Sequence, residues 1–430
     1  NTASGYAALL QNTTGAQNTA SGLNALELNN TGSYNTASGY FSLQKNTSGS
    51  YNTASGSRAL QFNTTGTYNA ASGYRALYNN TTGGYNAAIG SEALYNNTTG
   101  INNTASGWRA LYSNTTGINN TASGYRALRD NTTGNYNTAT GAEALYFNTT
   151  GDSNTASGYQ ALRDNTTGDD NTASGFYALY ENTTGNSNTA SGYRALYNNT
   201  TGSSNTASGW KALYKNTTGT RNIAIGYAAY DAADTENDNL AIGYDALGGA
   251  IDGGIQNVAI GNYSMDANVG GDGNIAIGYK SLSANVNNSW NTAIGHQSLL
   301  NTNLGGFNTG VGAKSLETNT SGVNNTAVGA NSLYTNDSGD ENTGVGRNSL
   351  YATTGSYNTS LGWYSGNEIT SGTYNTVIGH NASASGATAV NQTVIGAEAI
   401  GQGNNSVTLG DDAVTAIYAS EDAGATLYAA

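Results

Sequence analysis

The sequence predicts an all-β protein: a parallel β-solenoid (β-roll) of about 25 coils, each built from a 17-residue repeat. The first observation is the period, because the unit Asn-Thr-Ala-Ser-Gly-Tyr-x-Ala-Leu-x-x-Asn-Thr-Thr-Gly-x-x restarts every 17 residues from Asn1. The second is the composition: 59 Gly, no Pro and 10% charged residues fit neither a helical bundle nor a typical disordered chain. The third is the spacing of the glycine-containing turns, which leaves no room for a pair of helices. The ordered structure of the chain must therefore come from the stacking of successive coils.

The register of the repeat is nearly constant along the chain. We number the positions of the repeat 1 to 17, as in the first unit, and position 5 is Gly in all 25 copies. One inserted residue precedes Gly261, one deleted residue precedes Gly362, and the last step, to Gly410, is 14 residues. We therefore predict that the closing glycine is a structural requirement of every coil; its first four members are Gly5, Gly22, Gly39 and Gly56.

Positions 1 to 5 predict a short strand. In residues 222–226 they read Asn-Ile-Ala-Ile-Gly, so bulky side chains alternate with Ala and Gly. The restriction to small residues at positions 3 and 5 indicates a positive φ or a neighbouring backbone too close for a Cβ atom. We expect this small face to permit the close approach of another chain.

Positions 6 to 10 read Tyr-x-Ala-Leu-Tyr in their fullest form, and we expect a second short strand there. The recurring leucine, as in Leu9, Leu26 and Leu77, is predicted to be the main apolar filling of each coil. The Asn-Thr-Thr-Gly segment that follows, with Asn12 and Asn63 as examples, is typical of a tight turn. Stacked coils would place these Asn side chains in a ladder of amide hydrogen bonds and the Tyr rings in columns.

Composition divides the chain into three segments. Residues 1–221 carry polar repeats, residues 222–403 carry acidic repeats of the Ala-Ile-Gly type, and residues 404–430 form a terminal coil and C-terminal segment. The net charge of the chain is −13, and residues 222–430, with 3 Lys and Arg against 18 Asp and Glu, carry −15. This acidic half disfavours nucleic-acid binding. The chain has no Cys and no apolar run of membrane-spanning length, so we expect no disulfide, no membrane insertion of this segment and no cofactor.

The units at 222–226, 257–261, 291–295 and 375–379 resemble the head repeats of trimeric autotransporter adhesins and the repeat shafts of phage tail fibres. This resemblance implies a left-handed parallel β-roll and three chains around a threefold axis. Those families commonly use a shorter period, matched here only by the step to Gly410. Residues 405–420 are similar to the segment that precedes a self-cleaving intramolecular chaperone domain, and Asn1 lies inside a repeat, so we expect a longer precursor.

The function expected from the resemblance is that of a structural fibre shaft, extracellular, on a cell surface or on a virion, which provides reach and attachment. The alternative is a bacterial surface adhesin or a self-assembling extracellular filament. Expected partners are further copies of the chain, as a homotrimer or end to end, and a host-surface receptor or polysaccharide. We expect no enzymatic activity, because His296 and His380 occupy the aromatic position 6 and the repeats offer no cluster of catalytic carboxylates.

Four minor hypotheses concern the surface. The turn sequences match the acceptor pattern for N-glycosylation, although the turn itself also favours Asn and Thr; examples are Asn12, Asn46, Asn63, Asn114 and Asn131. Aromatic residues at repeat spacing could contact glycans or could be structural; they include Tyr78, Tyr95, Tyr112, Tyr197, Trp108 and Trp210. Repeated Thr and Ser at positions 2, 4, 13 and 14 form arrays like those of ice-binding solenoids. The acidic stretches 231–238 and 411–412 could hold a cation but match no calcium-loop spacing.

Overall fold

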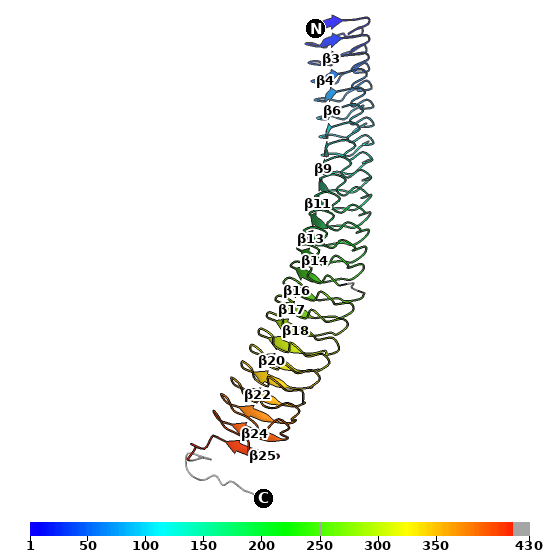
Figure 1. Ribbon diagram of the computed structural model, residues 1–430. Helices are drawn as coiled ribbons and strands as arrows, with labels where there is room; N and C mark the ends of the chain where they lie inside the picture. The colour runs from blue at the N-terminus through cyan, green and yellow to red at the C-terminus, as the bar shows by residue number, and fades with distance from the viewer. Residues whose placement is uncertain (250–251, 416–430) are drawn as a thin grey trace. The chain divides into compact units, whose positions relative to one another are not determined.

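The computed structural model describes residues 1–249 and 252–415, and the rest of the C-terminal segment, 416–430, lies outside the described residues. The described residues contain strands and turns and no helix. They form two compact units, residues 1–238 and residues 239 onward. In each unit the chain winds as a parallel β-solenoid with one strand per coil (Figure 1), so the predicted fold class is confirmed.

The first unit contains fourteen strands, each of three residues. They are β1 Thr2–Ser4, β2 Thr19–Ser21, β3 Thr36–Ser38, β4 Thr53–Ser55, β5 Ala70–Ser72, β6 Ala87–Ile89, β7 Thr104–Ser106, β8 Thr121–Ser123, β9 Thr138–Thr140, β10 Thr155–Ser157, β11 Thr172–Ser174, β12 Thr189–Ser191, β13 Thr206–Ser208 and β14 Ile223–Ile225.

The second unit contains eleven strands. They are β15 Leu240–Ile242, β16 Val258–Ile260, β17 Ile275–Ile277, β18 Thr292–Ile294, β19 Thr309–Val311, β20 Thr326–Val328, β21 Thr343–Val345, β22 Thr359–Leu361, β23 Thr376–Ile378, β24 Gln392–Ile395 and β25 Ser406–Leu409.

Neighbouring strands within a unit pair in parallel, with equivalent positions of the repeat side by side. Thr121 pairs with Thr138, and Ala122 pairs with Ala139. The central residue of nearly every strand is buried, while the residues before and after it point outward. This alternation follows from the two-residue period of a strand, and it directs position 3 into the coil and positions 2 and 4 to the surface.

The core of each coil consists of position 3, position 8 and the leucine at position 9. Leu26 and Leu77 are fully buried, which confirms the predicted apolar filling, whereas Leu9 is half-buried because only one coil covers it. In much of the second unit position 8 is Ser: the hydroxyl of Ser298 donates to the carbonyl oxygen of Gly310 at 2.9 Å. A Cβ atom on Gly310 would lie 2.6 Å from the Oγ of Ser298, so at this coil the larger residue at position 8 is matched by a smaller one at position 3.

The predicted second strand at positions 6 to 10 is wrong. This segment is a turn in which positions 7 and 9 have positive φ, as at Arg109 (55°) and Leu111 (52°). Left-handed residues at every second position cannot form a pleated strand. Hydrogen bonds between coils persist nevertheless: the amide of Leu111 donates to the carbonyl oxygen of Ala127 at 3.0 Å. Each coil is therefore one strand and a long series of turns.

The closing glycine is required for both of the reasons inferred from the sequence. Gly158 has φ of +137°, and a Cβ atom there would lie 2.5 Å from the carbonyl oxygen of Gly175 in the next coil. Ala156, two residues earlier, is fully buried inside the coil. The small Ala and Gly side is thus occupied within the chain itself, and the expectation that it receives another chain is wrong.

Candidate functional site

The Asn-Thr-Thr-Gly turns carry a buried ladder of asparagines at position 12. The side-chain amide of Asn148 donates to Oδ1 of Asn131 at 2.9 Å and to the carbonyl oxygen of Gly151 at 3.0 Å. Its own Oδ1 accepts from the amide of Asn165 at 2.7 Å. Twelve such bonds join the thirteen asparagines from Asn12 to Asn216. Each of these coils is therefore joined to the next by hydrogen bonds of the Asn side chain at position 12.

A second ladder runs through position 1, immediately before each strand. Oδ1 of Asn120 accepts from the backbone amide of Asn137 at 2.9 Å, and the side-chain amide of Asn137 donates to the carbonyl oxygen of Gly151 at 2.8 Å. The same Gly carbonyl thus receives one donor from each ladder. Because both Asn side chains are buried, these bonds replace water that the interior excludes.

The ladder at position 12 stops where the residue type changes. Asn216 precedes Ala233 in the next coil, and Asn285 precedes Thr302. In both cases the side-chain oxygen of the asparagine is buried and has no hydrogen-bond partner. At these two places the orphaned oxygen thus follows from the residue at position 12 of the next coil.

The five asparagines proposed as glycan acceptors all belong to this ladder. Asn46, Asn63, Asn114 and Asn131 are fully buried, and each amide nitrogen uses both hydrogens. Asn12 is half-buried in the first coil and donates to the carbonyl oxygen of Gly15 at 2.9 Å. A glycan on the four buried nitrogens would replace a ladder hydrogen and would have no path to solvent.

The aromatic residues form three columns, at positions 6, 10 and 17. At position 10 the rings of Tyr78, Tyr95 and Tyr112 are stacked with centroids 5.0 and 5.1 Å apart and planes within 9°. Tyr197 stacks in the same way between its neighbours at that position. Because each ring covers the face of the next, the rings present mainly their edges to solvent. A sugar that stacks on a ring face would have to displace a neighbouring ring.

The column at position 6 contains both proposed tryptophans. Trp108 stacks on Tyr125 at 5.1 Å, and Trp210 on Tyr227 at 4.4 Å. The basic side chain at position 7 lies between the columns: the guanidinium carbon of Arg109 is 4.5 Å from the Trp108 ring and 5.2 Å from Tyr112. Cation–π contacts of this kind hold the two columns together. Burial raises the pKa of the phenols of Tyr95, Tyr180 and Tyr197 in the position 10 column.

The column at position 17 was not among the sequence-based candidates. Tyr34, Tyr51, Tyr68 and Tyr85 are stacked at 4.8 to 4.9 Å and exposed. The signal was present, since Tyr recurs at one position of four consecutive repeats. The recurrence of Tyr did not by itself predict a stacked column, because an isolated Tyr beside a turn does not indicate which way the ring points.

The histidines continue the column at position 6, as their sequence position suggested. The ring of His296 is stacked on Tyr279 at 5.4 Å, and that of His380 on Trp363 at 4.9 Å. Both histidines are exposed. Within residues 1–249 and 252–415 there is no group of three or more His, Cys, Asp or Glu residues arranged to hold a metal ion.

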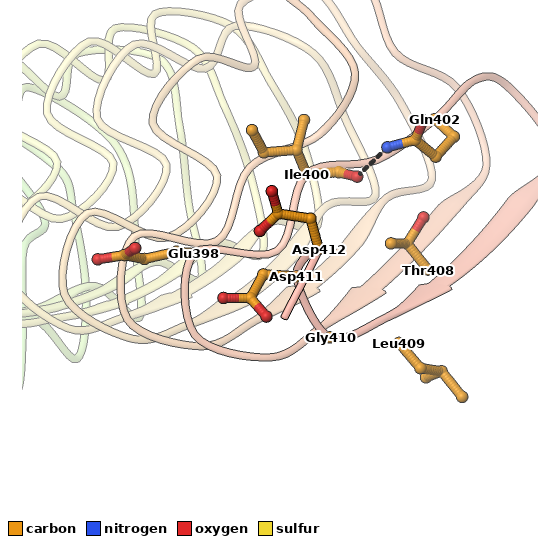
Figure 2. Close-up of a pocket in the computed structure, with 8 residues that line it drawn as sticks. All are labelled: Glu398, Ile400, Gln402, Thr408, Leu409, Gly410, Asp411 and Asp412. Atoms are coloured by element: carbon orange, nitrogen blue, oxygen red, sulfur yellow. Dashed lines mark hydrogen bonds between the residues drawn. The ribbon is translucent and has the colours of Figure 1, made fainter. Parts of the chain in front are cut away.

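The acidic stretches have local partners. Asp238 accepts two hydrogen bonds from Arg221, at 2.5 and 2.8 Å, and these hold the pKa of its carboxyl below the ordinary value. Oδ1 of Asp234 accepts from the hydroxyl of Thr217. Asp411 and Asp412 line a pocket at the last coil with Glu398, shown in Figure 2. The rest of the lining is largely uncharged, and the amide of Gln402 there donates to the carbonyl oxygen of Ile400 at 2.9 Å.

The outward residues of the strands, positions 2 and 4, form a face whose chemistry differs between the two units. In β1–β13 they are mainly Thr and Ser, and in β15–β25 position 4 is always Ile, Val or Leu. No strand carries a charged side chain at either position. Sequence reasoning recognised the change near residue 222, but it assigned contact with other chains to the small side of the strand, which is internal.

Among the described residues no apolar helix reaches the length needed to cross a bilayer. Comparison of the sequence with protein-family models and with curated proteins gives no match.

Proposed function

We propose that this chain is the shaft of a homotrimeric extracellular fibre, similar to a phage tail fibre, whose role is mechanical reach and attachment rather than catalysis. The observation that carries the proposal is the strand face of the second unit, defined by positions 2 and 4 of β15–β25, which we call the aliphatic strand face. Position 4 is aliphatic on every strand, whereas position 2 is aliphatic on β15–β17 and β25 and Thr on β18–β24. Position 4 forms an unbroken column: Ile242, Ile260, Ile277, Ile294, Val311, Val328, Val345, Leu361, Ile378, Ile395 and Leu409.

This face has the properties of a protein interface. Ile294, Val328 and Leu361, on β18, β20 and β22, are 37%, 38% and 50% exposed although they are aliphatic. The strand register places Val311 beside Val328 and Val345 beside Leu361, so the column is continuous. A contiguous column of exposed aliphatic side chains on a face without charge favours burial against another surface. Two outward residues on each of eleven strands give 22 side chains, which is within the range of about 20–30 residues per partner in a standard interface.

The partner proposed is a second and third copy of the same chain. Coil stacking fixes the spacing between aliphatic side chains along the face, so another copy in parallel presents the same spacing rung by rung. A partner with a different repeat would lose this match after a few coils. A cyclic trimer also buries all three faces at once around its axis and leaves none exposed.

The mechanical part of the proposal is supported by the way adjacent coils are joined. Two Asn ladders and the closing Gly contacts connect each coil to the next along residues 1–221, and the aromatic columns add stacking contacts in part of these coils. Such a repeat array derives its stability from nearest-neighbour contacts. The alternative, a surface adhesin or a self-assembling filament, would use the same shaft, and labelling of virions and of cell surfaces with an antibody to the chain distinguishes them.

The assembly is tested by sedimentation velocity of the purified chain. We expect a trimer for the wild type and a monomer for the double variant Ile294→Asp and Val328→Asp, because two buried carboxylates per chain oppose association. The matched control is Leu304→Asp, which places the same charge on a 70% exposed leucine outside the strands. A monomeric wild type, or equal loss of assembly in the control, would contradict the proposal.

A further inference from the structure

We propose that the strand face of β7–β13 in the first unit binds ice. This hydroxyl face consists of positions 2 and 4 of those strands: Thr104, Ser106, Thr121, Ser123, Thr138, Thr140, Thr155, Ser157, Thr172, Ser174, Thr189, Ser191, Thr206 and Ser208. It is the longest unbroken section, because β5 and β6 carry Ala70, Ala87 and Ile89 at these positions. The inference does not depend on the proposed trimer, which uses the second unit.

The hydroxyl face is a two-dimensional array with fixed repeats. In-register pairing places Thr121 beside Thr138 and Ser123 beside Thr140, and the other rungs repeat this pattern. Strands are about 4.7–4.9 Å apart, and alternate residues along a strand are about 6.4–6.8 Å apart. The strand spacing is close to the shorter repeat of oxygen atoms on a prism face of hexagonal ice, and the spacing along a strand is somewhat shorter than the longer repeat.

The hydroxyl groups of this face are available for hydrogen bonds to water or ice. Positions 2 and 4 are exposed in β7–β12 and half-exposed in β13. In the part of the chain that the structure describes, none of these side-chain hydroxyls makes an intramolecular hydrogen bond, whereas position 13 hydroxyls do: Thr132 donates to the carbonyl oxygen of Thr149 at 3.0 Å. The repeat therefore uses one Thr position to join coils and leaves another facing water.

The face also meets the chemical requirements of an ice surface rather than those of a dissolved ligand. It carries no charge that would order water differently, and each Thr adds a methyl group beside its hydroxyl. The β-branched Thr side chain has few rotamers, so little entropy is lost when the array is matched to a lattice. Many weak contacts presented on one rigid array add up by multivalency.

The hydroxyl face differs from the aliphatic face of the second unit in the feature that favours self-association. β7–β13 carry no Ile, Val or Leu at positions 2 and 4, so packing of a second copy there would bury hydroxyls with no apolar gain beyond the Thr methyl groups. The face at positions 2 and 4 of one repeat thus has two chemistries, which differ mainly at position 4: one is suited to protein contact and the other to ordered water.

The test measures thermal hysteresis and ice-crystal shaping by the purified full chain. We expect hysteresis for the wild type and its loss in the double variant Thr121→Lys and Thr155→Lys, which places two long cations on the hydroxyl face. The control variant, Thr116→Lys and Thr150→Lys, adds the same charges at exposed turn positions off the strands and should retain the hysteresis. Circular dichroism and sedimentation of all three proteins establish that fold and assembly are unchanged.

Four results would overturn the inference. The first is absence of hysteresis and of crystal shaping in the wild-type chain. The second is equal loss in the hydroxyl-face variant and in the turn variant, which would indicate a non-specific charge effect. The third is a change of oligomeric state caused only by the hydroxyl-face variant, which would make this face an interface between copies. Binding of the wild type to crystalline cellulose or chitin without any effect on ice would likewise assign the face to a polysaccharide instead.

Discussion

Replacement of Asn148 by Ala is expected to weaken the solenoid locally and strongly. The substitution removes the donor to Asn131 and to Gly151 and the acceptor for Asn165. It also leaves a small cavity where the amide group was, because Asn148 is fully buried.

The size of the expected destabilisation follows from the hydrogen bonds that the substitution removes. Two of the lost bonds leave a buried group unsatisfied, Oδ1 of Asn131 and one amide hydrogen of Asn165, at a cost of about 1–3 kcal/mol per group, whereas the carbonyl oxygen of Gly151 keeps the donor from Asn137. The cavity adds to this cost, and relaxation of the neighbouring turns reduces it. We therefore expect a loss of about 3–5 kcal/mol in the coupling between the coils on either side. The wild-type chain already contains one such site: the side-chain oxygen of Asn216 has no hydrogen-bond partner, because position 12 of the next coil is Ala233.

Native-state hydrogen exchange is the suitable assay, because repeat arrays open locally and a single global unfolding free energy is poorly defined for them. A loss of about 3–5 kcal/mol corresponds to exchange faster by roughly 100- to 4000-fold, since each 1.4 kcal/mol is tenfold. The affected amides are those that donate across the coil boundary, such as the amide of Thr149, which donates to Thr166.

The control is Thr150→Ala, an exposed position in the same turn for which the structure gives no side-chain hydrogen bond. We expect its exchange rates to change by less than about threefold, as for most surface substitutions. If Asn148→Ala changes the exchange no more than this control does, the ladder does not stabilise coil stacking and the reasoning fails.

Three further predictions concern the glycine, the acceptor asparagines and one acid. Gly158→Ala should lower the unfolding temperature sharply or prevent folding, because its Cβ would meet a backbone carbonyl oxygen at 2.5 Å and φ is +137°, whereas Gly403→Ala, where the space is open, should not. Mass spectrometry of chain secreted by a glycosylating host should show Asn114 unmodified; a glycan there would mean that the ladder forms only after modification or not at all. Burial raises the pKa of Asp266 despite the hydroxyl of Ser283 that donates to it. Its carboxyl is therefore protonated at higher pH in the folded chain than in the unfolded one, so the stability of the fold should rise as the pH falls from neutral through the raised pKa towards the ordinary value of 3.8. Thermal melts across that range should show this rise for the wild type and not for Asp266→Asn. A rise that persists in the variant would assign it to another group.

The features of the coil and of the candidate site were predictable from the sequence to different degrees. The closing glycine, the leucine core and the Asn ladder were all inferred correctly, because each depends on identical residues meeting at a fixed period. The second strand was not, since the positive φ at Arg109 and Leu111 is imposed by the closure of the coil and not by the intrinsic preference of either residue. The column of Tyr34, Tyr51 and Tyr68 was missed for a related reason: the turn geometry decides where the rings point.

The sequence by itself determined the period, the parallel stacking and the residue that must be glycine, because a 17-residue repeat without helix-length segments has few ways to satisfy its backbone hydrogen bonds. Only the tertiary structure decided which side of each strand faces the solvent. A three-residue strand has an inside and an outside that local sequence does not distinguish when both sides carry small or hydroxyl-bearing residues. The path of the turns settles the choice: it buries Ala122 and turns Thr121 and Ser123 outward. That orientation places the aliphatic and hydroxyl residues of positions 2 and 4 on the surface, where both proposed binding functions lie.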